Sequence, residues 1–142
     1  MKVHSTSLIR IALTTLALCT TASAQWYRGN LKDTLKRLEE DSDHFAKMLD
    51  TDLDHGPLNG TPTEDEINRY VHEFEEATDH LKDKWDDQQA APNLAREVLV
   101  RARTIDKFMR QHHPGPGSHS QWYRVRHSLD QVAYDYRIRW RW

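Results

Sequence analysis

The stretch that most constrains the fold is the last one, from Ser120 to Trp142. It contains three of the five tryptophans, and its apolar side chains recur at steps of three and four residues. That spacing places them on one face of an α-helix. The residues of this face are Trp122, Val125, Leu129, Val132, Ala133, Tyr136 and Trp140. Such a face must be covered by other elements, so the rest of the chain is expected to pack against it.

Three earlier segments have the same periodicity and are separated by breaks rich in proline and glycine. Thr63 and Glu66 fit a capping box at the start of the second segment, and Ser118 or Ser120 can cap the fourth. The predicted helices are Trp26 to Leu53, a helix from Thr63 to about Trp85, Pro92 to His112, and a last helix that continues to Trp142. Because the loops are too short for crossovers, we predict an all-α, antiparallel up-down-up-down four-helix bundle.

Residues 1–24 have the features of a secretory signal peptide. Lys2 and Arg10 supply positive charge, a short apolar run follows, and Ala22 to Ala24 are small residues at the cleavage positions. The apolar run is too short for a permanent membrane span, so we predict a mature single domain, residues 25–142, in the periplasm or outside the cell. Cleavage also removes Cys19, the only cysteine, which leaves the core to hold the domain without disulfides.

Charge is divided unequally between the two halves of the mature chain. Residues 25–91 contain 8 Lys or Arg against 18 Asp or Glu, a net charge of −10. Residues 92–142 contain 10 Lys or Arg against 4 Asp or Glu, a net charge of +6. This division predicts either electrostatic complementarity inside the chain or an exposed bipolar surface. We expect no nucleic-acid partner, since the chain is predicted to be exported and its mature net charge is negative.

The final residues, Tyr134 to Trp142, fit two periods at once. At period two, aromatic or apolar residues alternate with charged ones, as in an extended strand. In a helix, Tyr136 and Trp140 stay on the core face while the arginines point outward, and we adopt this interpretation. It predicts a tip that binds anionic lipid or an acidic partner through Arg137, Arg139, Trp140, Arg141 and Trp142. The alternative, which the usual behaviour of charge runs favours, is that the three arginines pair with the acidic second helix.

A second hypothesis is a metal or cofactor site. His112, His113 and His119 gather around one loop, and Asp50, Asp52 and Asp54 resemble part of a calcium loop. The remaining calcium-loop positions do not fit, because His55 and Thr61 stand where a glycine and a glutamate are required. The sequence contains no covalent-haem motif, nucleophile elbow, phosphate-binding loop or HExxH motif, so we predict no cofactor and no enzymatic activity.

The last helix also carries a resemblance to known proteins. The pattern Trp122-x3-Arg126-x2-Leu129-x3-Ala133-x2-Tyr136 resembles a group of small exported bacterial helical-bundle proteins of unassigned activity. The resemblance implies a helical bundle and transfers no catalytic residue. We therefore expect an interaction or scaffold protein that acts through its charged surface on an envelope protein or an anionic surface. A metal- or cofactor-binding bundle is the alternative. Oligomers are possible, and self-association between the charged halves would be sensitive to salt.

Overall fold

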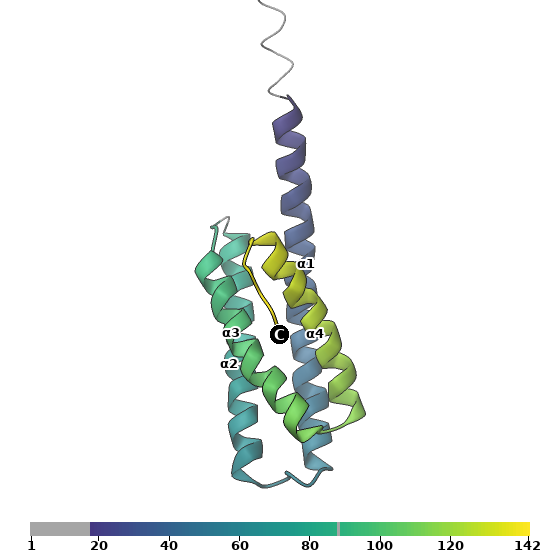
Figure 1. Ribbon diagram of the computed structural model, residues 1–142. Helices are drawn as coiled ribbons and strands as arrows, with labels where there is room; N and C mark the ends of the chain where they lie inside the picture. The colour runs from purple at the N-terminus through teal and green to yellow at the C-terminus, as the bar shows by residue number, and fades with distance from the viewer. Residues whose placement is uncertain (1–17, 88) are drawn as a thin grey trace, which may run out of the picture. The chain divides into compact units, whose positions relative to one another are not determined.

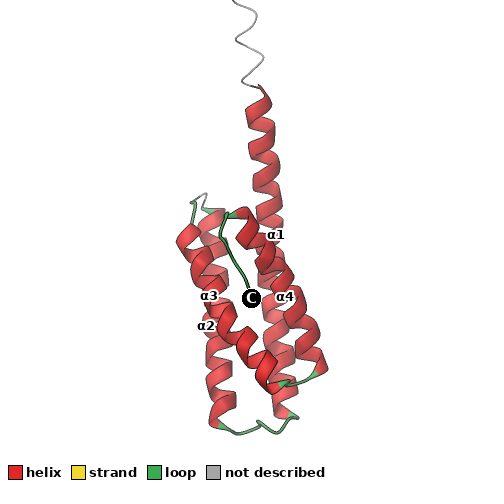
Figure 2. Cartoon of the chain, viewed as in Figure 1, coloured by secondary structure: helices red, strands yellow, loops and turns green. Residues whose placement is uncertain are grey.

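The computed structural model describes residues 18–87 and 89–142, which contain four α-helices and no strand (Figure 2). The helices are α1 (Leu18–Asp54), α2 (Pro62–Asp86), α3 (Pro92–His112) and α4 (Pro116–Asp135). The chain forms two units, residues 1–31 and 32–142. In the first unit, the described residues belong to the beginning of α1, and residues 1–17 of the predicted signal peptide lie outside the described part. None of the described helices has the length and apolar character of a membrane span.

The second unit contains α2, α3, α4 and the rest of α1, which lie alongside one another (Figure 1). Polar contacts join each helix to two others. These contacts are Lys82–Glu39 at 3.3 Å (α2–α1), Arg101–Glu73 at 2.7 Å (α3–α2), Trp122–Asp106 at 3.0 Å (α4–α3) and Ser128–Asp41 at 3.3 Å (α4–α1). The all-helical prediction is confirmed.

The core of the second unit is formed by the apolar faces that the periodicity predicts. Its centre is aromatic, because the Trp122 ring lies 4.9 Å from Phe45 and 6.2 Å from Phe74. Two of the buried polar side chains bond to their own helices: Ser42 donates to the carbonyl of Leu38 at 2.7 Å, and Thr78 donates to the carbonyl of Phe74 at 2.9 Å. A hydroxyl that donates to the carbonyl four residues earlier has its hydrogen bond within its own helix. Serine and threonine can therefore be buried in the core without a partner from another helix.

Two predicted helix starts are wrong. Helix α2 is capped by Thr61 instead of Thr63: the Thr61 hydroxyl accepts the amide of Glu64 at 3.3 Å, and Pro62 occupies the first helical turn. Proline is favoured there because the first turn needs no amide donor, and it moves the cap two residues earlier than expected. Helix α4 begins at Pro116 after an N-cap glycine, Gly115, so neither predicted serine is the cap.

The end of α4 is also different from the prediction, which continued the helix to Trp142. The helix ends at Asp135, and Arg137 has a left-handed backbone with φ 54°. The Arg137 amide donates to the Tyr134 carbonyl at 3.0 Å, and the Ile138 amide donates to the Ala133 carbonyl at 2.8 Å. These two bonds are a Schellman motif, which satisfies the last carbonyls of a helix and reverses the chain.

Candidate functional site

The C-terminal segment, residues 136–142, turns back along the molecule beside α3 and α4 (Figure 1). Trp142 anchors its end: the indole N–H donates to Asp130 Oδ1 at 2.9 Å, and the ring meets Trp122 edge-on at 6.2 Å. The Arg126 guanidinium lies 4.5 Å above the Trp142 ring, within the range of a cation–π interaction. The last residue of the predicted binding tip is therefore a packing anchor.

Trp140 is held in the same way. The Arg103 guanidinium lies 4.4 Å above its ring, and the rings of Trp140 and Trp142 meet edge-on at 5.3 Å. Arg103 also donates to the main-chain carbonyl of Arg141 at 3.0 Å. These contacts fix the C-terminal segment onto α3, so the two tryptophans stabilise the fold instead of projecting from it.

The three arginines of the C-terminal segment have a different environment. Arg137, Arg139 and Arg141 are exposed, and none of their guanidinium groups forms an ion pair with a residue of the described part of the chain. The interpretation in which they pair with the acidic second helix is therefore wrong for this structure. Residues 136 to 142 alternate between half-buried and exposed, which is the period of an extended chain lying on a surface.

A buried carboxylate that the sequence analysis missed lies beneath this segment. Asp106 has a side-chain exposure of 1%, and its Oδ1 accepts the indole N–H of Trp122 at 3.0 Å. Arg110 lies 2.9 Å from Oδ2, and Arg126 lies 3.5 Å from Oδ1. Two cations and one donor compensate the carboxylate for its lost hydration, as a buried charge requires. The signal was present in the sequence, since Asp106 interrupts the apolar face of α3 between Ala102 and Met109.

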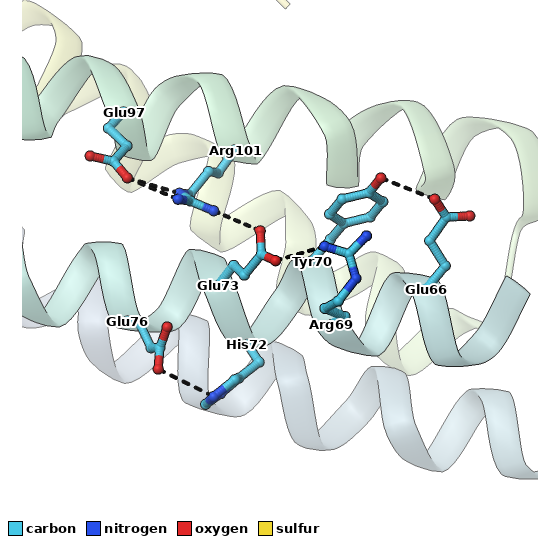
Figure 3. A network of polar contacts seen from close by, with 8 residues as sticks. All are labelled: Glu66, Arg69, Tyr70, His72, Glu73, Glu76, Glu97 and Arg101. Carbon is cyan, nitrogen blue, oxygen red and sulfur yellow. Dashed lines mark hydrogen bonds and ion pairs between the residues drawn. The ribbon is translucent and has the colours of Figure 1, made fainter. Parts of the chain in front are cut away.

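A polar network joins α2 to α3 on the side of the molecule shown in Figure 3. Arg101 binds Glu73 of α2 at 2.7 Å and Glu97 of its own helix at 2.9 Å, and Arg69 binds the other Glu73 oxygen at 2.7 Å. The hydrogen bond from Arg69 lowers the pKa of Glu73, with a smaller contribution from Arg101. Tyr70 donates to Glu66 at 3.0 Å and completes the α2 side. Glu73 and Glu97 are therefore neutralised by arginines, whereas Glu66 is bound by the neutral Tyr70 hydroxyl.

Three adjoining hollows follow α3 next to this network, and together they form what we call the α3 groove. Their volumes are about 510, 470 and 240 Å³. Thr104 lines all three, so they adjoin one another along the helix. Val100 is 62% exposed and forms an apolar floor with Tyr70. The cations that line the groove are Arg96, Arg101, Arg103, Lys107 and Arg110. Among the described residues, Arg96, Arg103 and Lys107 form no ion pair, although Arg103 is held by the Arg141 carbonyl and the Trp140 ring.

A second charged surface, the acidic strip, lies where α1 meets α2. Its members are Glu39, Asp43, Glu75, Asp79 and Asp83. Partial loss of hydration raises the pKa of Asp79, which is still exposed at the surface, and repulsion from Glu39 and Asp43 raises it further. Burial likewise raises the pKa of Glu75, again with repulsion from Asp43. Lys82 reaches Glu39 at 3.3 Å, and no cation lies within ion-pair distance of the other four in the described residues. The strip therefore carries a net negative charge that Lys82 and Lys47 compensate only in part.

The residues of the metal hypothesis are only partly brought together. The rings of His113 and His119 lie 5.6 Å apart, whereas His112 stacks on Phe108 at 4.6 Å. Nowhere in the described residues do three His, Cys, Asp or Glu side chains form a group that could hold a metal ion.

The three aspartates of that hypothesis are divided as well. Asp50 and Asp54 are exposed, while Asp52 accepts the amide of Ser118 at 2.7 Å, in the first turn of α4. A carboxylate at a helix N-terminus satisfies a free amide and interacts favourably with the helix dipole. The observed role of Asp52 is therefore to cap α4 from another helix.

Comparison with known proteins supplies no relative for this chain: no family model, curated protein or solved structure matches it.

Proposed function

We propose that this chain is an exported interaction protein that acts without catalysis, with its four helices arranged as an antiparallel up-down-up-down bundle. The short connections between helices and the contacts that join each helix to two others support the arrangement. In this proposal the partner is an acidic protein of the cell envelope. The signal-peptide features of residues 1–24 support the export step.

One observation carries the proposal: α3 and the C-terminal segment present cations that the described chain leaves unpaired. We call this surface the cationic face, and it consists of Arg96, Lys107, Arg137, Arg139 and Arg141. Arg103 connects its two parts, since it lines the α3 groove and also binds the Arg141 carbonyl. Arginine suits such a role because its guanidinium forms paired hydrogen bonds with carboxylates and is less strongly hydrated than an ammonium group.

The test uses poly-L-glutamate as a defined acidic probe, with binding to the purified mature protein measured by titration calorimetry at low salt. The variant Arg96→Glu/Lys107→Glu is compared with Lys32→Glu/Lys47→Glu, which changes net charge equally through two exposed lysines of α1. We expect the first pair to weaken binding by at least about tenfold and the second pair to have a much smaller effect, because a specific face acts locally. Equal losses in both pairs would show that only net charge matters and would refute the proposal.

A second experiment distinguishes an acidic protein from an acidic membrane as the partner. Vesicles of phosphatidylglycerol and phosphatidylcholine are titrated with the same variants. Binding to these vesicles together with failure to bind poly-L-glutamate would overturn the choice of a protein partner in favour of anionic lipid.

A further inference from the structure

The α3 groove is long enough to receive a folded surface instead of a single side chain. Its lining residues extend from Asn93 to His112, which corresponds to about 28 Å of helix at 1.5 Å per residue. The groove combines an apolar floor at Val100 and Tyr70 with a cationic edge on α3. Glu73 and Glu97 are already bound by Arg101, and the third carboxylate of the lining, Glu66, is outnumbered by Arg96 and Lys107, so the free charge of the groove is positive. Its occupant must therefore bring unpaired carboxylates.

The acidic strip of the same chain has this property. Asp43, Asp79 and Asp83 are exposed and form no ion pair within the described residues. Mutual repulsion is already present in the strip, since neighbouring carboxylates raise the pKa of Asp79. Cations supplied from outside would relieve that repulsion, so a positive partner gains more here than at an ordinary acidic surface.

A single chain cannot place its own strip in its own groove. Both surfaces include residues of α2, but these residues lie on opposite sides of its buried face. Tyr70 and Glu73 line the groove, whereas Asp79 and Asp83 belong to the acidic strip. Because an α-helix turns by 100° per residue, these two pairs lie on opposite sides of the buried face that contains Phe74 and Leu81. Figure 3 shows the groove edge directly, with Tyr70 and Glu73 pointing toward α3. The two charged surfaces of one chain therefore face different directions.

We propose that the α3 groove of one copy binds the acidic strip of a second copy, so that chains associate head to tail. This inference rests on the proposed function and names the acidic partner as the chain itself. The contact joins two different surfaces, so a bound pair still presents a free strip on one copy and a free groove on the other. Such a contact continues into a ring or a filament and does not stop at a symmetric dimer.

The test separates the two surfaces with two variants. The groove variant is Arg96→Glu/Lys107→Glu, and its strip is intact. The strip variant is Asp79→Asn/Asp83→Asn, and its groove is intact. Sedimentation velocity of the mature protein is measured over a range of concentrations at low salt and at about 0.5 M salt, where screening acts within a few ångströms. Far-UV circular dichroism and thermal melts confirm that both variants are folded.

The wild type is expected to grow in mass with concentration at low salt and to return toward the monomer at high salt. Each variant alone is expected to remain monomeric. An equimolar mixture of the two is expected to form a complex of twice the chain mass, because one intact groove meets one intact strip and no further copy can add. This complementation is specific to a head-to-tail contact.

Three results would overturn the inference: a monomeric wild type, a mixture that stays monomeric, or variants that associate as strongly as the wild type. The poly-L-glutamate titration distinguishes this failure from failure of the proposed function. If the mixture is monomeric while the wild type binds the probe and the groove variant does not, the second copy is the wrong partner and the cationic face remains a binding surface. If binding of the probe is also absent, both proposals fail.

Discussion

Gly115 lies where the Asp52 carboxylate of α1 meets the beginning of α4. A β-carbon at this position would lie 2.5 and 2.6 Å from the two Asp52 oxygens, closer than non-bonded atoms approach. The backbone of Gly115 is extended, with φ 176°, so the conformation itself does not require glycine. The requirement is space for the carboxylate. Gly115→Ala is therefore expected to push Asp52 away from the helix and to break its hydrogen bond to the Ser118 amide.

The size of the effect follows from what that hydrogen bond does. It is a charge-assisted bond of 2.7 Å to a free amide of the first helical turn, and removing a comparable cap costs about 1 to 2 kcal/mol of unfolding free energy. Replacing glycine by alanine also lowers the conformational entropy of the unfolded chain, which stabilises the folded protein by about 0.5 kcal/mol. The net destabilisation expected for Gly115→Ala is thus about 1 kcal/mol, measured by urea unfolding at pH 7 with far-UV circular dichroism.

Gly117→Ala is the matched control. Its β-carbon would lie 3.4 and 3.5 Å from the same Asp52 oxygens, close to ordinary contact distances, and alanine is favoured over glycine inside a helix by about 1 kcal/mol. This variant should be neutral or stabilising. In addition, Gly115→Ala should cost nothing further when Asp52 is already alanine, because both changes remove one contact. Additive losses in the double variant, or a Gly115→Ala protein as stable as wild type, would refute the steric explanation.

Three further predictions concern stability. Arg137→Gly should raise the unfolding free energy by about 0.5 to 1 kcal/mol in urea titrations, since glycine relieves the left-handed backbone and the exposed guanidinium forms no ion pair with described residues. Trp142→Ala should lower it by about 2 kcal/mol, because the anchor of the C-terminal segment is lost; an unchanged urea midpoint would contradict the packing role. Burial and nearby carboxylates raise the pKa of Asp79 above its ordinary 3.8, so the contribution of Asp79 to wild-type stability should fall as the pH rises from 3.8 through the raised value. Asp79→Asn should therefore be more stable than wild type at pH 7, and the difference should disappear below pH 3.8, which unfolding measured over a pH series would show.

The helices could be predicted because the side chains of a helix that are buried in one core recur every 3.6 residues along the sequence. Leu35, Phe74 and Leu129 are buried where that period places them. The caps could not be placed to the residue, because several acceptors compete at each start. Thr61 and Thr63 both precede an acidic residue by three positions, and only the preference of Pro62 for the first turn distinguishes them. The cap of α4 is supplied by Asp52 from another helix, which no local pattern indicates.

The candidate site was less predictable than the fold because it depends on contacts between distant residues. Asp106 interrupts an apolar face, and its role becomes evident only when Trp122, Arg110 and Arg126 are placed around it. The division of charge between the two halves was visible in the sequence. Whether it is compensated inside the chain depends on which sides of the helices carry the charges. The structure places the acidic strip on α1 and α2 and the cationic face on α3 and the C-terminal segment.

The C-terminal segment shows why one periodicity can be decided only by three-dimensional context. Its apolar residues alternate with charged ones, and some of them also fit the spacing of a helix. The helical prediction is correct as far as Asp135 and wrong after it. A helix continued to Trp142 would leave the ring of Trp122 without the cover that the reversed segment supplies at 6.2 Å.

The reversal requires a left-handed residue, and Arg137 accepts that conformation at a cost of about 1 to 2 kcal/mol. The packing of Trp140 and Trp142 against Arg103, Arg126 and Asp130 offsets this cost. Because the aromatic side chains point inward, the alternation turns every arginine of the segment outward, so the same packing that fixes the fold also exposes the charges available for binding.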